Sequence, residues 1–118
     1  MPVTFNYVFA GIAVADYPAL REWYERLMGR PADLVPHDTE VAWQLTDTGW
    51  IYVKADADRS GKAFVTFLVD DLDAQLAALA ERGIASGPVD TMTNGTRTAV
   101  VTDPEGNTIQ FGEVPGGR

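Results

Sequence analysis

The first half of the chain begins with apolar residues in two alternating sets and then changes to helical spacing. From Phe5 to Val14 both the odd and the even positions are largely apolar, which predicts a β-strand covered on both faces. Asp16 stands where a helix N-cap is expected, and apolar residues then recur at helical spacing as far as Met28. Gly29 follows in the position of a left-handed C-cap. A strand followed by an amphipathic helix is therefore expected here.

The rest of this half predicts a β-hairpin. Two prolines make residues 31–36 irregular and leave room for a short edge strand. Residues 40–45 and 50–54 have the composition of paired strands around a polar turn. The polar and charged stretch 55–61 predicts a linker. We therefore expect a first module at about residues 1–55.

The second half repeats this order. Residues 63–69 predict another two-sided apolar strand, Asp70 or Asp71 caps a helix, and Gly83 ends it. A hairpin signal at Asn94-Gly95 lies among three further expected strands, around residues 88–93, 97–102 and 107–113. Asp71 follows Asp16 by 55 residues, and Gly83 follows Gly29 by 54. Such a repeat predicts two units that share one core, with the second module at about 62–118 and a single domain over residues 1–118.

The second module ends in a distinctive turn and strand, Thr102-Asp103-Pro104-Glu105-Gly106-Asn107-Thr108-Ile109-Gln110-Phe111. Together with the paired modules, this segment resembles the vicinal oxygen chelate superfamily, which holds glyoxalase I, extradiol dioxygenases and drug-binding proteins of the bleomycin-resistance type. The resemblance covers nearly the whole chain. It implies an α+β fold of two βαβββ modules, with curved mixed sheets around a cleft and helices on the outer faces. The turn itself has a structural role, because Pro, Gly and Asx residues set its backbone.

Composition narrows the classes of function. The chain has no cysteine, which excludes disulfides and thiolate chemistry, and no apolar run near the ~20 residues of a membrane helix. Its first 15 residues lack the features of a signal peptide, so a cytoplasmic location and no membrane partner are expected. The net charge of −8 argues against a nucleic-acid partner. That charge would attract a cationic ligand, or it would simply keep the protein soluble.

The resemblance also implies where metal ligands would lie in the enzymes of the family. The corresponding positions hold Phe9, Val53 (or Tyr52 after a slip of one residue), Phe64 and Gln110. Phenylalanine rings offer no donor atoms and one carboxamide cannot hold a metal. We therefore expect no metal, no cofactor and no catalytic residue, and the single histidine, His37, lies off this register.

The aromatic residues Phe9 and Phe64 occupy positions at which the enzymes of the family have metal ligands. We predict that a ligand-binding face is formed by nine residues: Phe5, Tyr7, Phe9, Trp43, Trp50, Tyr52, Phe64, Thr66 and Gln110. The resulting hypothesis is a metal-free protein of the bleomycin-resistance type, commonly a homodimer, that sequesters a planar or aromatic small molecule such as an antibiotic. Two alternatives stay open. One is a metal-dependent lyase, isomerase or dioxygenase with ligands in another register, and the other is a regulatory or interaction module with a filled cavity.

Overall fold

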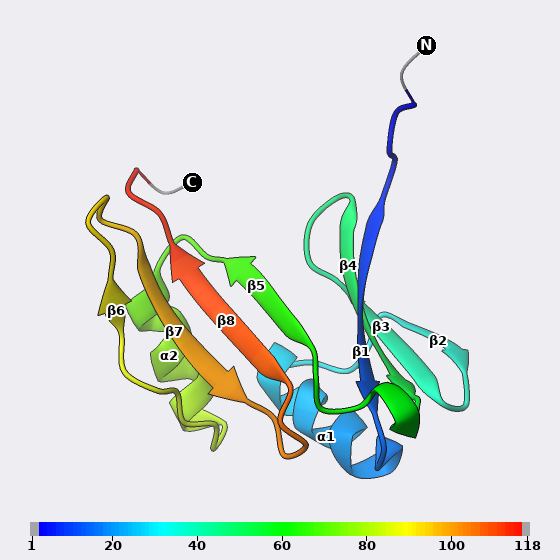
Figure 1. The fold of residues 1–118 in the computed structure, drawn as a ribbon. Helices are drawn as coiled ribbons and strands as arrows, with labels where there is room; N and C mark the ends of the chain where they lie inside the picture. The colour runs from blue at the N-terminus through cyan, green and yellow to red at the C-terminus, as the bar shows by residue number, and fades with distance from the viewer. Residues whose placement is uncertain (1–2, 117–118) are drawn as a thin grey trace. The chain divides into compact units, whose positions relative to one another are not determined.

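The chain forms two compact units, residues 1–60 and 61–118, each with the order strand, helix and three strands. The computed structural model describes residues 3–116. The boundary between the units, at Ser60 and Gly61, falls inside the segment predicted as a linker. Each unit has a mixed four-stranded sheet with a helix, as Figure 1 shows. The α+β fold of two βαβββ modules is therefore confirmed.

Unit 1 consists of β1 (Val8–Val14), α1 (Tyr17–Met28), β2 (Leu34–His37), β3 (Glu40–Gln44) and β4 (Gly49–Ala55). The strand order in its sheet is β1-β4-β3-β2. β1 runs parallel to β4, and the other neighbours are antiparallel. α1 begins where the Asp16 carboxylate accepts a hydrogen bond from the backbone N–H of Ala19, and it ends at Gly29, whose φ is 75°. Both ends of this helix are where the sequence predicts them.

The core of unit 1 lies on one face of the sheet. β1 and β4 each contribute alternate buried residues, among them Ile12 and Ile51, and β3 buries the three successive residues Val41, Ala42 and Trp43. The apolar stripe of α1 is buried with them: Tyr17, Leu20, Trp23, Tyr24 and Leu27. This pattern differs from the expected two-sided strand, because β1 buries only its even-numbered residues from Ile12 onward. Its odd-numbered residues face away from this core, so the helix of unit 1 does not cover the second face of the sheet.

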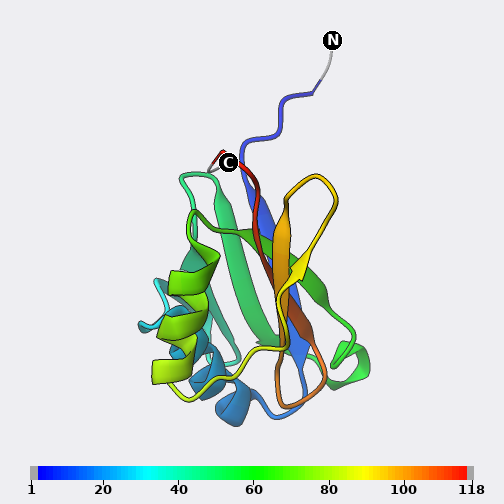
Figure 2. The ribbon, with the colours of Figure 1, turned by 90° about the vertical axis from the view of Figure 1, so that its left-hand side faces the viewer.

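Unit 2 has the same plan. Its elements are β5 (Phe64–Leu68), α2 (Leu72–Glu81), β6 (Asp90–Thr91), β7 (Arg97–Thr102) and β8 (Thr108–Glu113), with strand order β5-β8-β7-β6. β5 runs parallel to β8. Figures 1 and 2 show α2 along one face of the sheet. Its buried residues Leu72 and Leu79 belong to a core that includes Val101, Ile109 and Phe111. The strand expected around residues 88–93 is shorter than predicted, because only Asp90 and Thr91 pair with β7.

The turn before β8 is held by two buried polar side chains. The Asp103 carboxylate accepts hydrogen bonds from the backbone N–H groups of Glu105 and Asn107, at 2.8 and 3.0 Å. It also accepts one from Asn107 Nδ2 at 2.8 Å. Asn107 Oδ1 accepts a bond from the N–H of Ala63, 44 residues away, at 2.9 Å. The motif therefore ties the turn to the start of β5, which is a structural role as expected.

No helix among residues 3–116 is long and apolar enough to cross a membrane.

Candidate functional site

The face of the unit 1 sheet that is opposite the buried core carries a row of paired residues along β1 and β4. The register of these parallel strands sets Phe9 beside Trp50, Gly11 beside Tyr52, and Ala13 beside Lys54. We call this surface, defined by those six residues, the open face of unit 1. Successive pairs lie about 7 Å apart along the strands, since side chains of alternate residues point to the same side. The three pairs therefore form one continuous strip.

Phe9 and Trp50 form an aromatic stack at one end of the strip. Their ring centroids lie 5.5 Å apart and their planes differ by 17°. Phe9 is 50% exposed, although a phenylalanine that served only the core would be buried. A half-exposed stack presents flat apolar surface on which a planar molecule can pack. This stack is the strongest feature of the open face.

Tyr52 continues the aromatic surface along the strip. Its ring lies across Gly11: a Cβ at Gly11 would lie 2.6 Å from both the Tyr52 Cζ and its hydroxyl oxygen. Glycine is therefore needed at this position for the ring to lie in this place. The sequence left one ligand position of the family open between Val53 and Tyr52, and the structure places these two residues on opposite faces of the sheet. Val53 is fully buried in the core, whereas Tyr52 lies on the open face.

Three of the residues predicted for the binding face lie elsewhere in unit 1. Trp43 is fully buried on the core side of the sheet, and its indole N–H donates to the backbone carbonyl of Arg30 at 3.0 Å. The pairing of β3 with β4 explains this position, because Trp43 lies beside the buried Ile51 and its side chain is on the same face of the sheet. Phe5 and Tyr7 precede β1, which begins at Val8, so they are not part of the strand that was expected to start at Phe5. They are 87% and 59% exposed.

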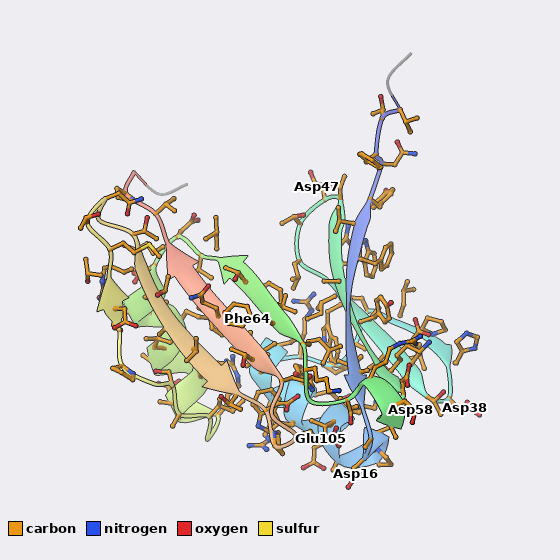
Figure 3. The ribbon with its side chains drawn as sticks, viewed as in Figure 1. Asp16, Asp38, Asp47, Asp58, Phe64 and Glu105 are labelled. Carbon is orange, nitrogen blue, oxygen red and sulfur yellow. The ribbon has the colours of Figure 1, made fainter. Side chains whose placement is uncertain are left out.

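Unit 2 has its own open face, opposite the side that contacts α2. Phe64, Thr66 and Leu68 of β5 share this face with Gln110 of β8 and Val100 of β7. Phe64, labelled in Figure 3, is 65% exposed. The Thr66 hydroxyl donates to Gln110 Oε1 at 2.9 Å, so that two of the predicted polar residues contact one another. This surface combines exposed apolar groups with a few uncharged polar ones, a composition typical of small-molecule sites.

The residues at the family's ligand positions do not fit a metal ion. Phe9 and Phe64 have no donor atoms, and the amide oxygen of Gln110 already accepts a hydrogen bond from Thr66. Among the described residues, no three His, Asp or Glu side chains converge in a way that could hold a metal. We therefore derive no chemical step through a metal.

The groups with shifted pKa values lie away from both open faces. The hydrogen bond from Arg30 lowers the pKa of Asp33, and a second bond from the Gln44 N–H acts in the same direction. The hydrogen bond from Arg97 lowers the pKa of Asp73 on α2. Burial raises the pKa of Tyr17 in the core. These shifts have structural causes, so they do not indicate an acid and base in the candidate site.

Three residues of the open face of unit 1 were not among the predicted site residues: Gly11, Ala13 and Lys54. The signal was present for Lys54, because it follows Trp50 and Tyr52 at two-residue intervals on the same strand. Gly11 and Ala13 follow Phe9 in the same way. Small residues on a strand carry no chemistry of their own, so only the register with β4 shows that they leave space beside Tyr52.

Comparisons with known proteins agree with this architecture. A family model described as the Glyoxalase/Bleomycin resistance protein/Dioxygenase superfamily matches residues 4–111. A glyoxalase/bleomycin resistance protein from Catenulispora acidiphila is 40% identical, with a TM-score of 0.87 over 92% of this chain and 98% of that chain. TnmS3, an antibiotic binding protein from a Streptomyces species, is 21% identical, with a TM-score of 0.75 over 97% and 98% of the two chains.

A bleomycin-binding protein in complex with bleomycin is 16% identical, with a TM-score of 0.74 over 92% of this chain and 98% of that chain. At these low identities, the two antibiotic-binding proteins show a common fold alone. No curated protein matches the chain. The family model spans most of the chain, the Catenulispora protein is 40% identical, and the two βαβββ units agree with the vicinal oxygen chelate fold. The chain therefore belongs to the glyoxalase, bleomycin resistance protein and dioxygenase superfamily.

Proposed function

We propose that this protein binds a planar, aromatic small molecule and sequesters it without chemical change. The observation that carries the proposal is the half-exposed stack of Phe9 on Trp50, on a sheet face that the core of unit 1 does not use. Aromatic rings at the surface of a rigid sheet offer stacking and apolar burial to a flat ligand. The open face of unit 2 has an exposed aromatic ring of its own, Phe64.

The residues at the metal-ligand positions support binding over metal-assisted catalysis. Those positions hold Phe9, Phe64, Gln110 and either Val53 or Tyr52, and with either residue the set has too few donors for a divalent ion. The alternative of a metal-dependent enzyme with ligands in another register has no cluster of donor residues to support it within residues 3–116. Two proteins of the same fold are described as binding antibiotics, which makes antibiotics the first ligands to test.

The test is a thermal-shift and fluorescence screen with bleomycin and a panel of planar aromatic antibiotics and metabolites. A ligand that binds the native state raises the melting temperature by mass action, by an amount that grows with ligand concentration. Stacking on Trp50 would also change the tryptophan emission. Each planar compound is paired with its ring-saturated analogue, which has similar size but no aromatic face. A panel in which no planar compound protects the protein at millimolar concentration would refute the proposal.

A further inference from the structure

A pocket of about 160 Å³ lies at one end of the open face of unit 1 and shares four residues with it. It sits where β1 and β4 end, on the same face as Tyr52. Because these two strands are parallel, their carboxyl ends meet at one edge of the sheet. Its lining consists of Gly11, Ile12, Ala13, Tyr52, Lys54, Asp56 and Arg59. The pocket therefore joins the end of the proposed binding face rather than forming a separate site.

Small residues and a short turn give the pocket its shape. The Tyr52 ring lies across Gly11, and the small Ala13 lies beside Lys54 in the register; all four residues line the pocket. The 3₁₀ turn η1 (Ala57–Arg59), located in Figure 3 by the label of Asp58, follows β4 at this edge. The N–H of Asp56 donates to the carbonyl of Val14 at 2.9 Å, which holds the start of this turn against β1.

The charges of the lining leave one cation without a partner. Arg59 donates to Asp56 Oδ2 at 2.8 Å, so these two charges largely neutralise one another. The Lys54 side chain makes no hydrogen bond or ion pair with any described residue. Glu40 lies opposite Lys54 in the sheet register but forms no ion pair with it. The lining therefore has one net positive charge, although the chain as a whole has a net charge of −8.

We propose that this pocket binds the carboxylate of an aromatic acid, with Lys54 as its counter-ion and Tyr52 beside its ring. This inference rests on the proposed function and specifies the class of ligand. Tyr52 and Lys54 are two residues apart on β4, about 7 Å, which suits a carboxyl group attached directly to a ring. The negative net charge of the chain attracts cations over long distances, but salt weakens this attraction beyond about 10 Å. At contact distance the Lys54 ammonium decides the preference.

The experiment compares three probes of the same shape: naphthoate, the neutral naphthamide and the cationic naphthylmethylamine. Isothermal titration calorimetry with the full chain at low and moderate salt gives their affinities. Naphthoate should bind roughly three- to tenfold more tightly than naphthamide, as expected for a partly exposed charge-assisted contact. Lys54→Met should abolish this difference while leaving naphthamide binding in place, and Lys54→Arg should retain it. Lys62→Met is the matched control, because Lys62 is the other lysine of the chain and lies outside the pocket.

The outcomes separate this inference from the proposed function. If naphthamide binds as tightly as naphthoate, or if naphthylmethylamine binds most tightly, the carboxylate assignment is wrong and the aromatic binding face stands. The assignment is also wrong if Lys62→Met weakens naphthoate as much as Lys54→Met does. Failure of all three probes to bind at millimolar concentration would overturn both the pocket assignment and aromatic binding by this face.

Discussion

Replacing Phe9 by alanine tests whether this residue belongs to a binding surface or to a structural core. Phe9 is 50% exposed and its burial comes partly from the stack on Trp50. Full burial of a phenylalanine side chain is worth about 1.5–3 kcal/mol, so a half-buried one contributes about 1 kcal/mol. The ring pair adds about 0.5–1.5 kcal/mol. Phe9→Ala should therefore lower the free energy of unfolding by roughly 1.5–2.5 kcal/mol.

Phe111→Ala is the matched control for this change. Phe111 is 4% exposed and packs against Phe67, with ring centroids 5.9 Å apart, in the core of unit 2. A phenylalanine deleted from a core leaves a cavity and costs about 3–5 kcal/mol. The two variants should therefore differ clearly in urea denaturation, with Phe111→Ala the more destabilised.

Ligand affinity gives the second measurement. A planar ligand stacked on the pair should bind Phe9→Ala about five- to a hundredfold more weakly, corresponding to roughly 1–3 kcal/mol of lost stacking and apolar burial. The affinity of folded Phe111→Ala should stay close to that of the parent protein. If Phe9→Ala is destabilised as much as Phe111→Ala and no planar ligand stabilises the parent, then Phe9 serves the core and the binding hypothesis fails.

The remaining predictions concern a glycine, a turn, acid stability and assembly. Gly11→Ala should leave the melting temperature within a few degrees, because the Tyr52 ring can swing away, but should weaken planar ligands measurably in calorimetry; unchanged affinity would exclude Tyr52 from the site. Asn107→Ala should cost roughly 1–3 kcal/mol in urea denaturation, since the Asp103 carboxylate and the Ala63 N–H lose buried partners; an effect below 0.5 kcal/mol would contradict the role given to this turn. The pKa values of Asp33 and Asp73 are lowered in the folded state, so these carboxylates stabilise the fold above the unfolded carboxyl pKa of about 3.9, and this stabilisation is lost as the pH falls through the folded pKa values. Asp33→Asn and Asp73→Asn should therefore flatten the pH dependence of the urea midpoint between about pH 2 and 5. An unchanged slope in both variants would refute this. A homodimer is expected, and light scattering should give about twice the chain mass of 12.8 kDa, whereas the mass of one chain would exclude it.

Most of the fold follows from local signals in the sequence. Asp16 and Asp71 both cap their helices as predicted, because a short side chain with an acceptor oxygen satisfies the first free N–H groups of a helix. The helix stripe of α1 also faces the core, since helical spacing fixes which residues share a side. The extents of strands are harder to predict. Phe5 and Tyr7 continue the alternation of β1, but β4 begins at Gly49 beside Val8 and offers them no partner.

The residues of the candidate site could be predicted only in part, because a sheet has two faces and the sequence does not show which one the helix covers. Trp43 and Trp50 belong to the same hairpin, and both are large aromatic residues suited to a ligand surface. The register pairs Trp43 with Ile51 and therefore places it in the core, whereas Trp50 is in register with Phe9 on the other face. A shift of one residue along a strand exchanges the faces, which is why the choice between Val53 and Tyr52 required the structure.

The proposed aromatic site would orient a ligand less strictly than a metal site does. A metal orients its ligand through short, directional bonds, whereas the Phe9–Trp50 stack orients only the plane of a ring. A flat surface of this kind would accept many aromatic molecules with similar affinity. Discrimination must then come from the polar groups at its margin, and on unit 1 that margin is the pocket that contains Lys54. Removing the Lys54 charge should therefore reduce selectivity among aromatic compounds more than it reduces their average affinity.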